Sequence, residues 1–259
     1  MNTATALRGA GILVTRPVSQ ASTLIEAIEA AGGTAIDFPA VEIAPPEDSR
    51  ALGRQIGRLR EFDLLIFVSP TTVEQAWPLI CARHGDWPHG FALAAVGPGS
   101  AKRLKHFGAK HVLAPEDGAG SEALLAMPGL ESVTGKRILI LRGEGGRETL
   151  RDTLGQRGAT VEYAECYRRM RPSLDPAPLL ALWAQGGVRA VTVTSREILD
   201  NLVDLLGPEG LNHLRATPTF VVHSRIADAA RAHGLTHIRV TAAGDAGLLA
   251  ALIEHFSSP

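Results

Sequence analysis

A repeat with a constant spacing of 126 residues constrains the fold of this sequence more than any other feature. The stretch GILVTRPVSQASTL at 11–24 aligns with RILILRGEGGRETL at 137–150, so that Arg16 falls on Arg142 (142 − 16 = 126). The match continues without a gap through AGGTAID and RGATVEY. An apolar run, a helical pattern and a second apolar run therefore occur twice, which indicates a repeated βαβ unit.

Two further pairs of segments keep the same spacing. DLLIFVSPTTVEQA at 63–76 matches RAVTVTSREILDNL at 189–202, and the stretch 91–112 matches 217–238, again without gaps. Alternating strand and helix patterns of this kind predict a parallel doubly wound sheet. We therefore predict an α/β protein with two similar, flavodoxin-like lobes.

The order of the repeated segments predicts that one lobe is discontinuous. If each lobe needs one copy of every segment, the first lobe is built from 1–38 and 172–259, and the second, 47–163, is inserted into it. The stretches 39–46 and 164–171 then cross from lobe to lobe. Their alternating VEI and CYR sequences favour pairing as a two-stranded β-ladder, which would act as a hinge beside a cleft.

Composition and charge exclude several classes of protein. With 45% apolar and 20% charged residues the chain is typical of a globular protein, and its formal net charge of −1 offers no overall attraction to nucleic acid or to an anionic membrane. Cys81 and Cys166 lie far apart and outside any CxxC motif, which favours buried free thiols in a reducing compartment. Since no apolar run approaches the roughly 20 residues of a membrane span, we expect a cytoplasmic protein. We expect a monomer because no unusually apolar external helix stands out.

Hydroxyl groups, glycines and arginines gather at the predicted carboxyl ends of the strands, where ligands bind in open α/β sheets. The helix after each strand begins with free backbone N–H groups, which together with arginines can bind carboxylates or phosphates. The candidates for this anion site are Thr15, Arg16, Ser69, Thr71, Gly97, Ser100, Arg142, Gly143, Arg147, Ser195, Arg196, His223 and Ser224. For any one of them, a helix cap or a solvated side chain is the alternative interpretation.

The loop RGEGGR at 142–147 is similar to a nucleotide-binding loop only in its glycine content. Its spacing is neither GxGxxG nor GxxxxGK[ST]. Asp37 and Glu162, near the second strand of each copy, could bind a ribose, but neither follows a dinucleotide fingerprint. The closely spaced histidines have no HExxH motif or acidic partner. We therefore expect neither a nucleotide site nor a metal site.

Five stretches taken in order resemble the uroporphyrinogen-III synthase family over nearly the whole chain: ILVTRP, FVSPTTVEQ, AAVGPGSAKRL, ILRGEGGRETLRDTLGQRGATVEYAECYRR and VTVTSREILDNL. Members of that family have two α/β lobes joined by a two-stranded ladder, with the active site in the cleft. The resemblance implies a carbon–oxygen lyase that closes linear hydroxymethylbilane into uroporphyrinogen III in tetrapyrrole and haem biosynthesis. It implies no metal or organic cofactor. A transient contact with hydroxymethylbilane synthase, the preceding enzyme, is a further prediction.

The reaction that the resemblance implies has two parts. Loss of the hydroxymethyl hydroxyl gives an azafulvene, and attack by the substituted carbon of the terminal ring gives a spiro intermediate that reopens and closes with that ring inverted. Because the bilane closes unaided to the type I isomer, the enzyme must position its substrate as well as accelerate the reaction. The substrate's eight carboxylates would be held largely by backbone amides and small polar side chains.

Tyr167 matches the family tyrosine that is thought to assist loss of the hydroxyl. A phenol is protonated at neutral pH and can donate a hydrogen bond or a proton, while the alternative for Tyr167 is packing between the lobes. His223 departs from the glycine often found at the corresponding turn of the family. It is either a second donor or a helix cap.

Two other classes remain open. A non-catalytic two-lobed binding module for a small polyanionic ligand would use the same anion site but leave its ligand unchanged. A two-lobed glycosyltransferase would need affinity for a nucleotide and, at the cleft of the second lobe, an acid or a pair of glutamates with six residues between them. The sequence lacks that pattern.

Overall fold

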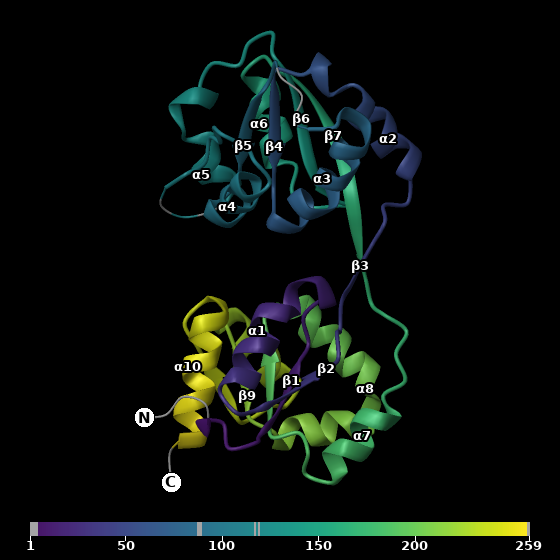
Figure 1. The fold of residues 1–259 in the computed structure, drawn as a ribbon, viewed down its shortest axis with the longest axis vertical. Coiled ribbons are helices and arrows are strands. Elements are labelled where there is room, and N and C mark those ends of the chain that lie inside the picture. The colour runs from purple at the N-terminus through teal and green to yellow at the C-terminus, as the bar shows by residue number, and fades with distance from the viewer. Residues whose placement is uncertain (1–4, 87–89, 117, 119, 258–259) are drawn as a thin grey trace. The chain divides into compact units, whose positions relative to one another are not determined.

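The computed structural model describes residues 5–86, 90–116, 118 and 120–257. The chain divides into two compact units, which we call unit 1 (Met1–Ile43 and Met170–Pro259) and unit 2 (Ala44–Arg169). Each unit contains one five-stranded sheet with helices packed on it (Figure 1). The predicted α/β class with doubly wound parallel sheets is confirmed. The use of 39–46 and 164–171 as a hinge stays a prediction.

The sheet of unit 1 has the strand order β10-β9-β8-β1-β2, with parallel neighbours throughout. This is the flavodoxin-like order, in which the chain reverses its direction of winding between β1 and β8. The elements are β1 (Gly11–Val14), α1 (Val18–Ala30), β2 (Thr34–Asp37), α7 (Ala177–Ala184), β8 (Ala190–Val193), α8 (Arg196–Ala216), β9 (Thr219–Val221), α9 (Ser224–Ala232), β10 (Ile238–Val240) and α10 (Gly244–Ser257).

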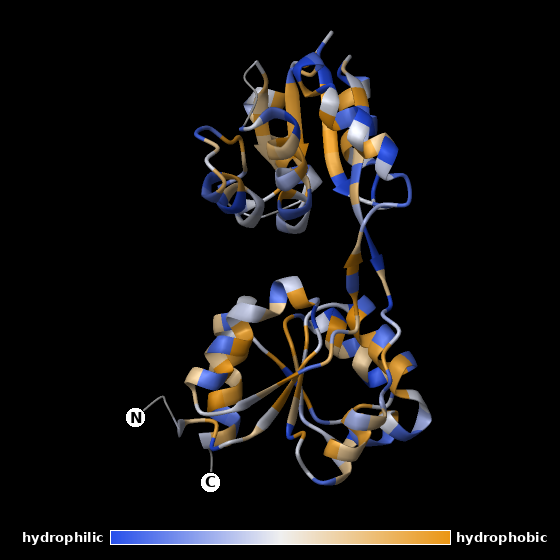
Figure 2. Cartoon of the chain, turned by 45° about the vertical axis from the view of Figure 1, so that its right-hand side comes forward, coloured by the Kyte–Doolittle hydropathy of each residue, from blue (hydrophilic) through white to orange (hydrophobic). Residues whose placement is uncertain are grey.

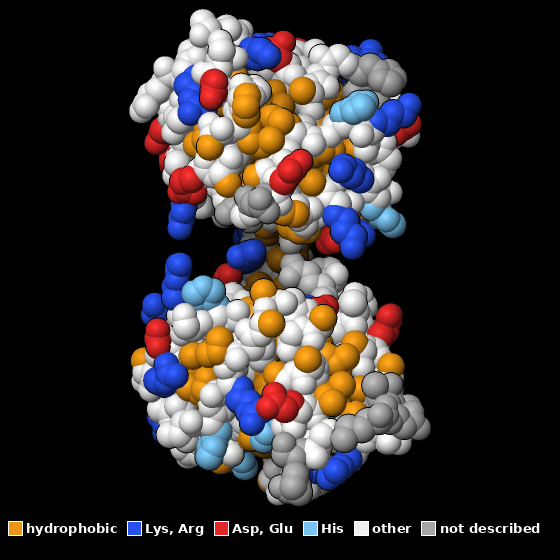
Figure 3. Space-filling view, turned by 90° about the vertical axis from the view of Figure 1, so that its left-hand side faces the viewer, with side chains coloured by type: hydrophobic (Ala, Val, Ile, Leu, Met, Phe, Trp, Pro, Cys, Tyr) orange, Lys and Arg blue, Asp and Glu red, His pale blue; other side chains and the backbone are white. Residues whose placement is uncertain are grey.

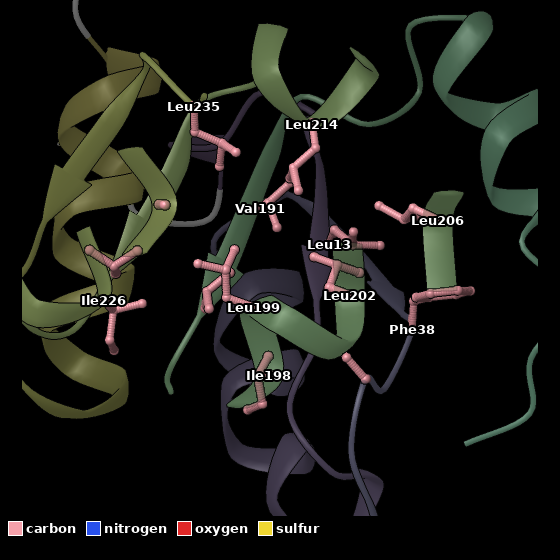
Figure 4. Close-up of a cluster of buried hydrophobic side chains, with 14 of the residues drawn as sticks. Leu13, Phe38, Val191, Ile198, Leu199, Leu202, Leu206, Leu214, Ile226 and Leu235 are labelled. Carbon is pink, nitrogen blue, oxygen red and sulfur yellow. The ribbon is translucent and has the colours of Figure 1, made fainter. Parts of the chain in front are cut away.

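The core of unit 1 lies on both faces of this sheet, because successive residues of a strand point to opposite faces. Leu13 of β1 packs in a cluster with Val191 of β8 and with Leu199 and Leu202 of α8 (Figure 4). The neighbouring residue Ile12 belongs instead to a second cluster, with residues of α1 and α10. Burial on both faces explains why β1 reads as a continuous apolar run rather than an alternating one.

The second sheet has the order β3-β7-β6-β4-β5 and belongs to unit 2 except for Glu42 and Ile43 of β3 and Met170 of β7. Its central strands are among the most hydrophobic parts of the unit (Figure 2), and β3 beside β7 supplies the predicted two-stranded pairing. The elements are β3 (Glu42–Ala44), α2 (Ser49–Gly57), η2 (Leu59–Glu61), β4 (Leu64–Phe67), α3 (Pro70–His84), β5 (Ala92–Ala95), α4 (Pro98–His106), α5 (Ser121–Leu125), η3 (Pro128–Leu130), β6 (Arg137–Gly143), α6 (Thr149–Gln156) and β7 (Thr160–Met170).

The structure confirms the duplication. Adding 126 to the bounds of β4 gives 190–193, the bounds of β8, and adding 126 to those of α4 gives 224–232, the bounds of α9. One difference is that α1 shifted by 126 would begin at 144, whereas α6 begins at Thr149. Gly145 and Gly146 have φ values of 73° and 104°, which a helix cannot contain, so the loop delays the start of α6.

The structure bears on three expectations from composition: the mixed surface charge, the lack of a membrane span and the buried thiols. Basic and acidic side chains are interspersed over each unit on the face shown in Figure 3. Within the described ranges, no helix is long and apolar enough to cross a membrane. Cys166 is buried and Cys81 partly buried, both with free thiols, and burial raises the pKa of the Cys166 thiol to about 12. The prediction of buried thiols is thus confirmed for Cys166.

Unit 1 is expected to lose stability in mild acid through His255 of α10. Its ring lies edge-on to Phe220 and Phe256, and burial, helped by the charges of Arg239 and Arg189, lowers its pKa from the usual 6.5. The unfolded chain then binds this proton more readily than the folded one, so stability falls as the pH drops below about 6.5. Thermal unfolding at pH 7.5 and 5.5 should show a smaller drop in Tm for His255→Gln than for the unaltered protein, and equal drops would contradict the assignment.

Candidate active site

The carboxyl ends of the strands form one edge of each sheet, and the predicted site residues lie along these two edges. In doubly wound sheets, ligands bind where the winding direction reverses. This point lies between β1 and β8 in unit 1 and between β6 and β4 in unit 2.

At the edge of unit 1, Thr15 and Arg16 follow β1 directly. The Thr15 hydroxyl is buried and donates to the carbonyl oxygen of Thr192 at 2.6 Å, so it ties β1 to β8. The Arg16 guanidinium is only 11% exposed and forms an ion pair of 2.6 Å with Asp245 at the start of α10. Thr15 has a structural task here, whereas Arg16 could exchange its carboxylate partner for another.

Two other residues of this edge cap helices, as the alternative interpretation expected. Ser195 accepts a hydrogen bond from the backbone N–H of Ile198 at 3.1 Å and caps α8. His223 Nδ1 accepts from the backbone N–H of Arg225 at 3.1 Å and caps α9, so this ring nitrogen is engaged as an acceptor. Ser224, the first residue of α9, is exposed.

Ser69 has the same capping role at the edge of unit 2 and a further neighbour. Its hydroxyl accepts from the backbone N–H of Thr72 at 3.1 Å and lies 2.9 Å from the Thr72 hydroxyl. It also lies 3.4 Å from the hydroxyl of Tyr167, a long hydrogen bond. Thr71, in the first turn of α3, is buried. Ser69 is therefore both a cap and a polar neighbour of the proposed proton donor.

The start of α4 differs from the start of its repeat partner α9. Gly97 stands where α9 has His223 (97 + 126 = 223), so α4 has no side chain that caps it. Ser100 in its first turn is buried, with an exposed fraction of 3%. The first N–H groups of α4 therefore have no capping side chain to compete with a bound anion.

Tyr167 of β7 connects three strands of unit 2, whose neighbouring positions are visible in Figure 1. Its side chain is 3% exposed, its ring lies against Gly143 at the end of β6, and its hydroxyl reaches Ser69 at the end of β4. The structure thus brings together Ser69 and Gly143, which the sequence placed at separate strand ends, and Tyr167, which it placed on a linker strand. The Tyr167 hydroxyl lies at the reversal point of the sheet.

Arg142 lies in a network that sequence reasoning did not find. Its guanidinium is 12% exposed, pairs with Glu148 at 3.0 Å and Glu165 at 3.2 Å, and lies 3.6 Å from the centre of the Tyr163 ring. Its Nε is buried without a hydrogen-bond partner. The alternation of EYAE along β7 is the signal that could have placed Tyr163 and Glu165 on one face with Arg142.

The same network sets the pKa of two of its members. Hydrogen bonds from Arg142 and then from Tyr163 hold the pKa of Glu148 below its usual value. Burial, followed by donation of the phenol to Glu148 at 2.9 Å, raises the pKa of Tyr163 to about 12. Glu148 therefore stays ionised and Tyr163 protonated at neutral pH. The pair holds the Arg142 side chain against β7.

The loop after β6 corrects one expectation. The helix after this strand, like the others, was expected to offer free N–H groups at the strand end, but α6 begins only at Thr149, after Glu148. The backbone N–H of Glu144 donates to the carbonyl oxygen of Tyr167 at 2.8 Å, and its carboxylate accepts from the backbone N–H of Glu47. The helix begins late because Gly145 and Gly146 have left-handed backbone φ values, which a helix cannot contain. The loop therefore packs on β7, and the close approach at Gly143 is to Tyr167.

The two remaining arginines are exposed ion-pair partners. Arg147 is 76% exposed and lies 3.5 Å from Glu122, while Arg196 is 77% exposed and lies 3.3 Å from Asp200. Such pairs contribute only about 0–1 kcal/mol to stability, so either side chain can turn toward another anion.

Glu162, one of the two acidic residues considered for binding a ribose, is held by other side chains. Glu162 binds Arg137 at 3.1 Å and Gln55 at 3.0 Å, so this carboxylate is already engaged. Among the residues that the structure describes, no group of three or more histidine, cysteine, aspartate or glutamate side chains could hold a metal ion.

The comparison with known proteins decides the family. A family model described as "Uroporphyrinogen-III synthase HemD" matches residues 22–250. The chain belongs to the uroporphyrinogen-III synthase family. Uroporphyrinogen-III synthase of Escherichia coli K12 is 37% identical over 230 residues, which are 88% of this chain and 94% of that protein. The Salmonella typhimurium enzyme is 35% identical over the same shares of the two chains.

Solved structures of the family have the same fold. The structure of a mutant uroporphyrinogen III synthase from the extremely thermophilic bacterium Thermus thermophilus matches with a TM-score of 0.53 and 18% identity, covering 95% of this chain and 97% of that one. The Helicobacter pylori uroporphyrinogen-III synthetase matches with a TM-score of 0.55 and 15% identity, covering 94% and 98%. The resemblance to the uroporphyrinogen-III synthase family is thus confirmed. The role of each candidate site residue stays a prediction.

Proposed function

We propose that this protein is a uroporphyrinogen-III synthase: it cyclises hydroxymethylbilane to uroporphyrinogen III with inversion of the terminal pyrrole ring and loss of water. The observation that carries this proposal is the 37% identity over 94% of a protein of that name, since a match of this extent includes residues of both units. The enzyme would be a cyclising carbon–oxygen lyase of tetrapyrrole and haem biosynthesis.

In this proposal Tyr167 donates to the departing hydroxyl of the substrate. Its phenol is nearly buried, lies next to the Ser69 hydroxyl and stands at the reversal point of the unit 2 sheet. A donor that is held in place by packing needs little reorganisation during the reaction. Ser69 can accept from the phenol or donate to it, and so keep the phenolic proton directed along the edge.

The carboxylates of the substrate would bind along both sheet edges. Free N–H groups at the uncapped start of α4 and the hydroxyl of Ser100 are suited to one of them. Arg16 and Arg142 already hold carboxylates, from Asp245 and Glu148, so both offer the geometry that a carboxylate of the substrate needs. The other proposed contacts are Thr15, Thr71, Gly143, Arg147, Ser195, Arg196, His223 and Ser224.

We further propose that the protein works in the cytoplasm as a monomer, without a metal or organic cofactor, and receives its substrate through a transient contact with hydroxymethylbilane synthase. These points rest on the family and on the instability of the bilane. Rapid transfer of the bilane from hydroxymethylbilane synthase would limit its spontaneous closure to the type I isomer.

The test supplies freshly generated hydroxymethylbilane to the purified protein without added cofactor. The products are oxidised and the uroporphyrin isomers separated by chromatography. We expect predominantly type III isomer, formed faster than the spontaneous closure. Type I isomer alone, at the spontaneous rate, would contradict the proposal and leave a non-catalytic binding module for a polyanion as the function to pursue.

A further inference from the structure

The pairing between β6 and β7 changes register at the end of β6. From Arg137 opposite Thr160 to Arg142 opposite Glu165, the paired residues differ by 23 positions, but Gly143 is opposite Tyr167, a difference of 24. One extra residue, Cys166, is therefore inserted in β7 as a β-bulge. The corresponding pairing of β1 with β2 in unit 1 has no such shift.

The bulge changes the face of the sheet to which Tyr167 points. Tyr163 packs with the cluster beneath α5 and α6 and donates to Glu148 next to α6. In an unbroken strand, Tyr167 would point to the same face as Tyr163, four residues earlier, because side chains alternate. One inserted residue reverses that alternation. Tyr167 instead lies beside Ser69, the cap of α3, on the opposite face.

Gly143 leaves the space that the reoriented ring occupies. A Cβ atom at this position would lie 2.8 Å from Cζ and 2.9 Å from Cε2 of Tyr167, which is closer than packed atoms allow. The backbone of Gly143 does not have a left-handed φ, so the ring alone is what excludes a side chain. The main chain of Tyr167 is held on the same side by the hydrogen bond from the Glu144 N–H to its carbonyl oxygen, at 2.8 Å.

We propose that Gly143 and the bulge at Cys166 are a positioning device for the Tyr167 hydroxyl. The bulge turns the ring toward the reversal point of the sheet. Because position 143 has no side chain, the ring can lie against the backbone there, and its hydroxyl reaches Ser69. Gly143 is then also a positioning residue, because its lack of a side chain makes room for the Tyr167 ring. This inference rests on the proposed function.

The test is Gly143→Ala, assayed for type III product at several bilane concentrations. We expect kcat to fall on the order of tenfold with KM nearly unchanged, because a small displacement of a donor weakens the reaction step rather than binding. In a Tyr167→Phe background the same substitution should cause no further loss, since no hydroxyl is left to displace. Gly155→Ala in α6, where nothing lies within 4 Å of the new methyl group, is the matched control and should keep full activity.

Three results would overturn the inference while leaving the proposed function intact. These are full type III activity in Gly143→Ala, an equal further loss in the Tyr167→Phe background, or a loss carried by KM alone. If Gly143→Ala does not fold, Gly143→Ala/Tyr167→Ala decides: recovery of folding supports the ring contact, and continued unfolding contradicts it. Failure of the unaltered protein to form type III isomer would instead count against the proposed function.

Discussion

Replacement of Tyr167 by phenylalanine is expected to lower the rate of type III isomer formation on the order of 10²-fold, the lower range for loss of a proton donor. The substitution removes one hydroxyl, and the ring, which is 3% exposed and packed against Gly143, keeps its place. The bilane still closes spontaneously, so the product should shift from type III toward type I. Isomer chromatography at matched times measures both effects.

Tyr163→Phe is the matched control, because Tyr163 and Tyr167 are the two tyrosines of the chain and both lie on β7. The Tyr163 phenol donates to Glu148 rather than facing the sheet edge. Losing this hydrogen bond should cost about 1 kcal/mol of stability and leave the isomer ratio unchanged. Type III formation at the unaltered rate in Tyr167→Phe would remove Tyr167 from the mechanism.

Substitution of Gly11 by alanine is expected to destabilise unit 1 by about 3 kcal/mol, the upper part of the usual range for overpacking. Gly11 begins β1, and a Cβ atom there would lie 1.8 Å from the carbonyl oxygen of Gly187 and 3.0 Å from the Ile36 side chain. The backbone cannot easily withdraw, because the carbonyl of Gly11 accepts from Arg189 N–H at 2.8 Å. Urea unfolding monitored by circular dichroism measures the change in the free energy of unfolding.

Gly53→Ala is the control for this substitution. Gly53 lies in the exposed part of α2 with nothing within 4 Å of the added methyl group, so alanine should stabilise the helix by about 0.5–1 kcal/mol. The two copies of the repeat differ at this contact. Arg137 and Glu61 stand where unit 1 has Gly11 and Gly187 (137 − 126 = 11; 187 − 126 = 61), and they form an ion pair of 3.0 Å. An unchanged free energy of unfolding in Gly11→Ala would show that the two backbones separate without cost.

The repeat predicted most of the elements because strands, helices and their caps are encoded over short stretches of chain. Apolar runs followed by a hydroxyl residue placed the ends of β4 and β8 and the caps Ser69 and Ser195, and both caps have the expected hydrogen bonds. The same local logic failed at α6, where the glycines after Arg142 delay the helix to Thr149. Local sequence therefore determined the order and class of the elements, and less reliably their first residues.

The site depends on contacts between residues far apart in the chain, and these only the tertiary structure decided. Whether Arg142 faces solvent or lies between Glu148 and Glu165 depends on how β6 pairs with β7. Whether Tyr167 faces α6 or Ser69 depends on a single inserted residue in that pairing. The sequence by itself determined two flavodoxin-like units and placed hydroxyl groups and arginines at the ends of their strands, because periodicity and turn chemistry are local. Strand register decided which side chains meet at those edges, because one residue of shift moves a side chain to the other face.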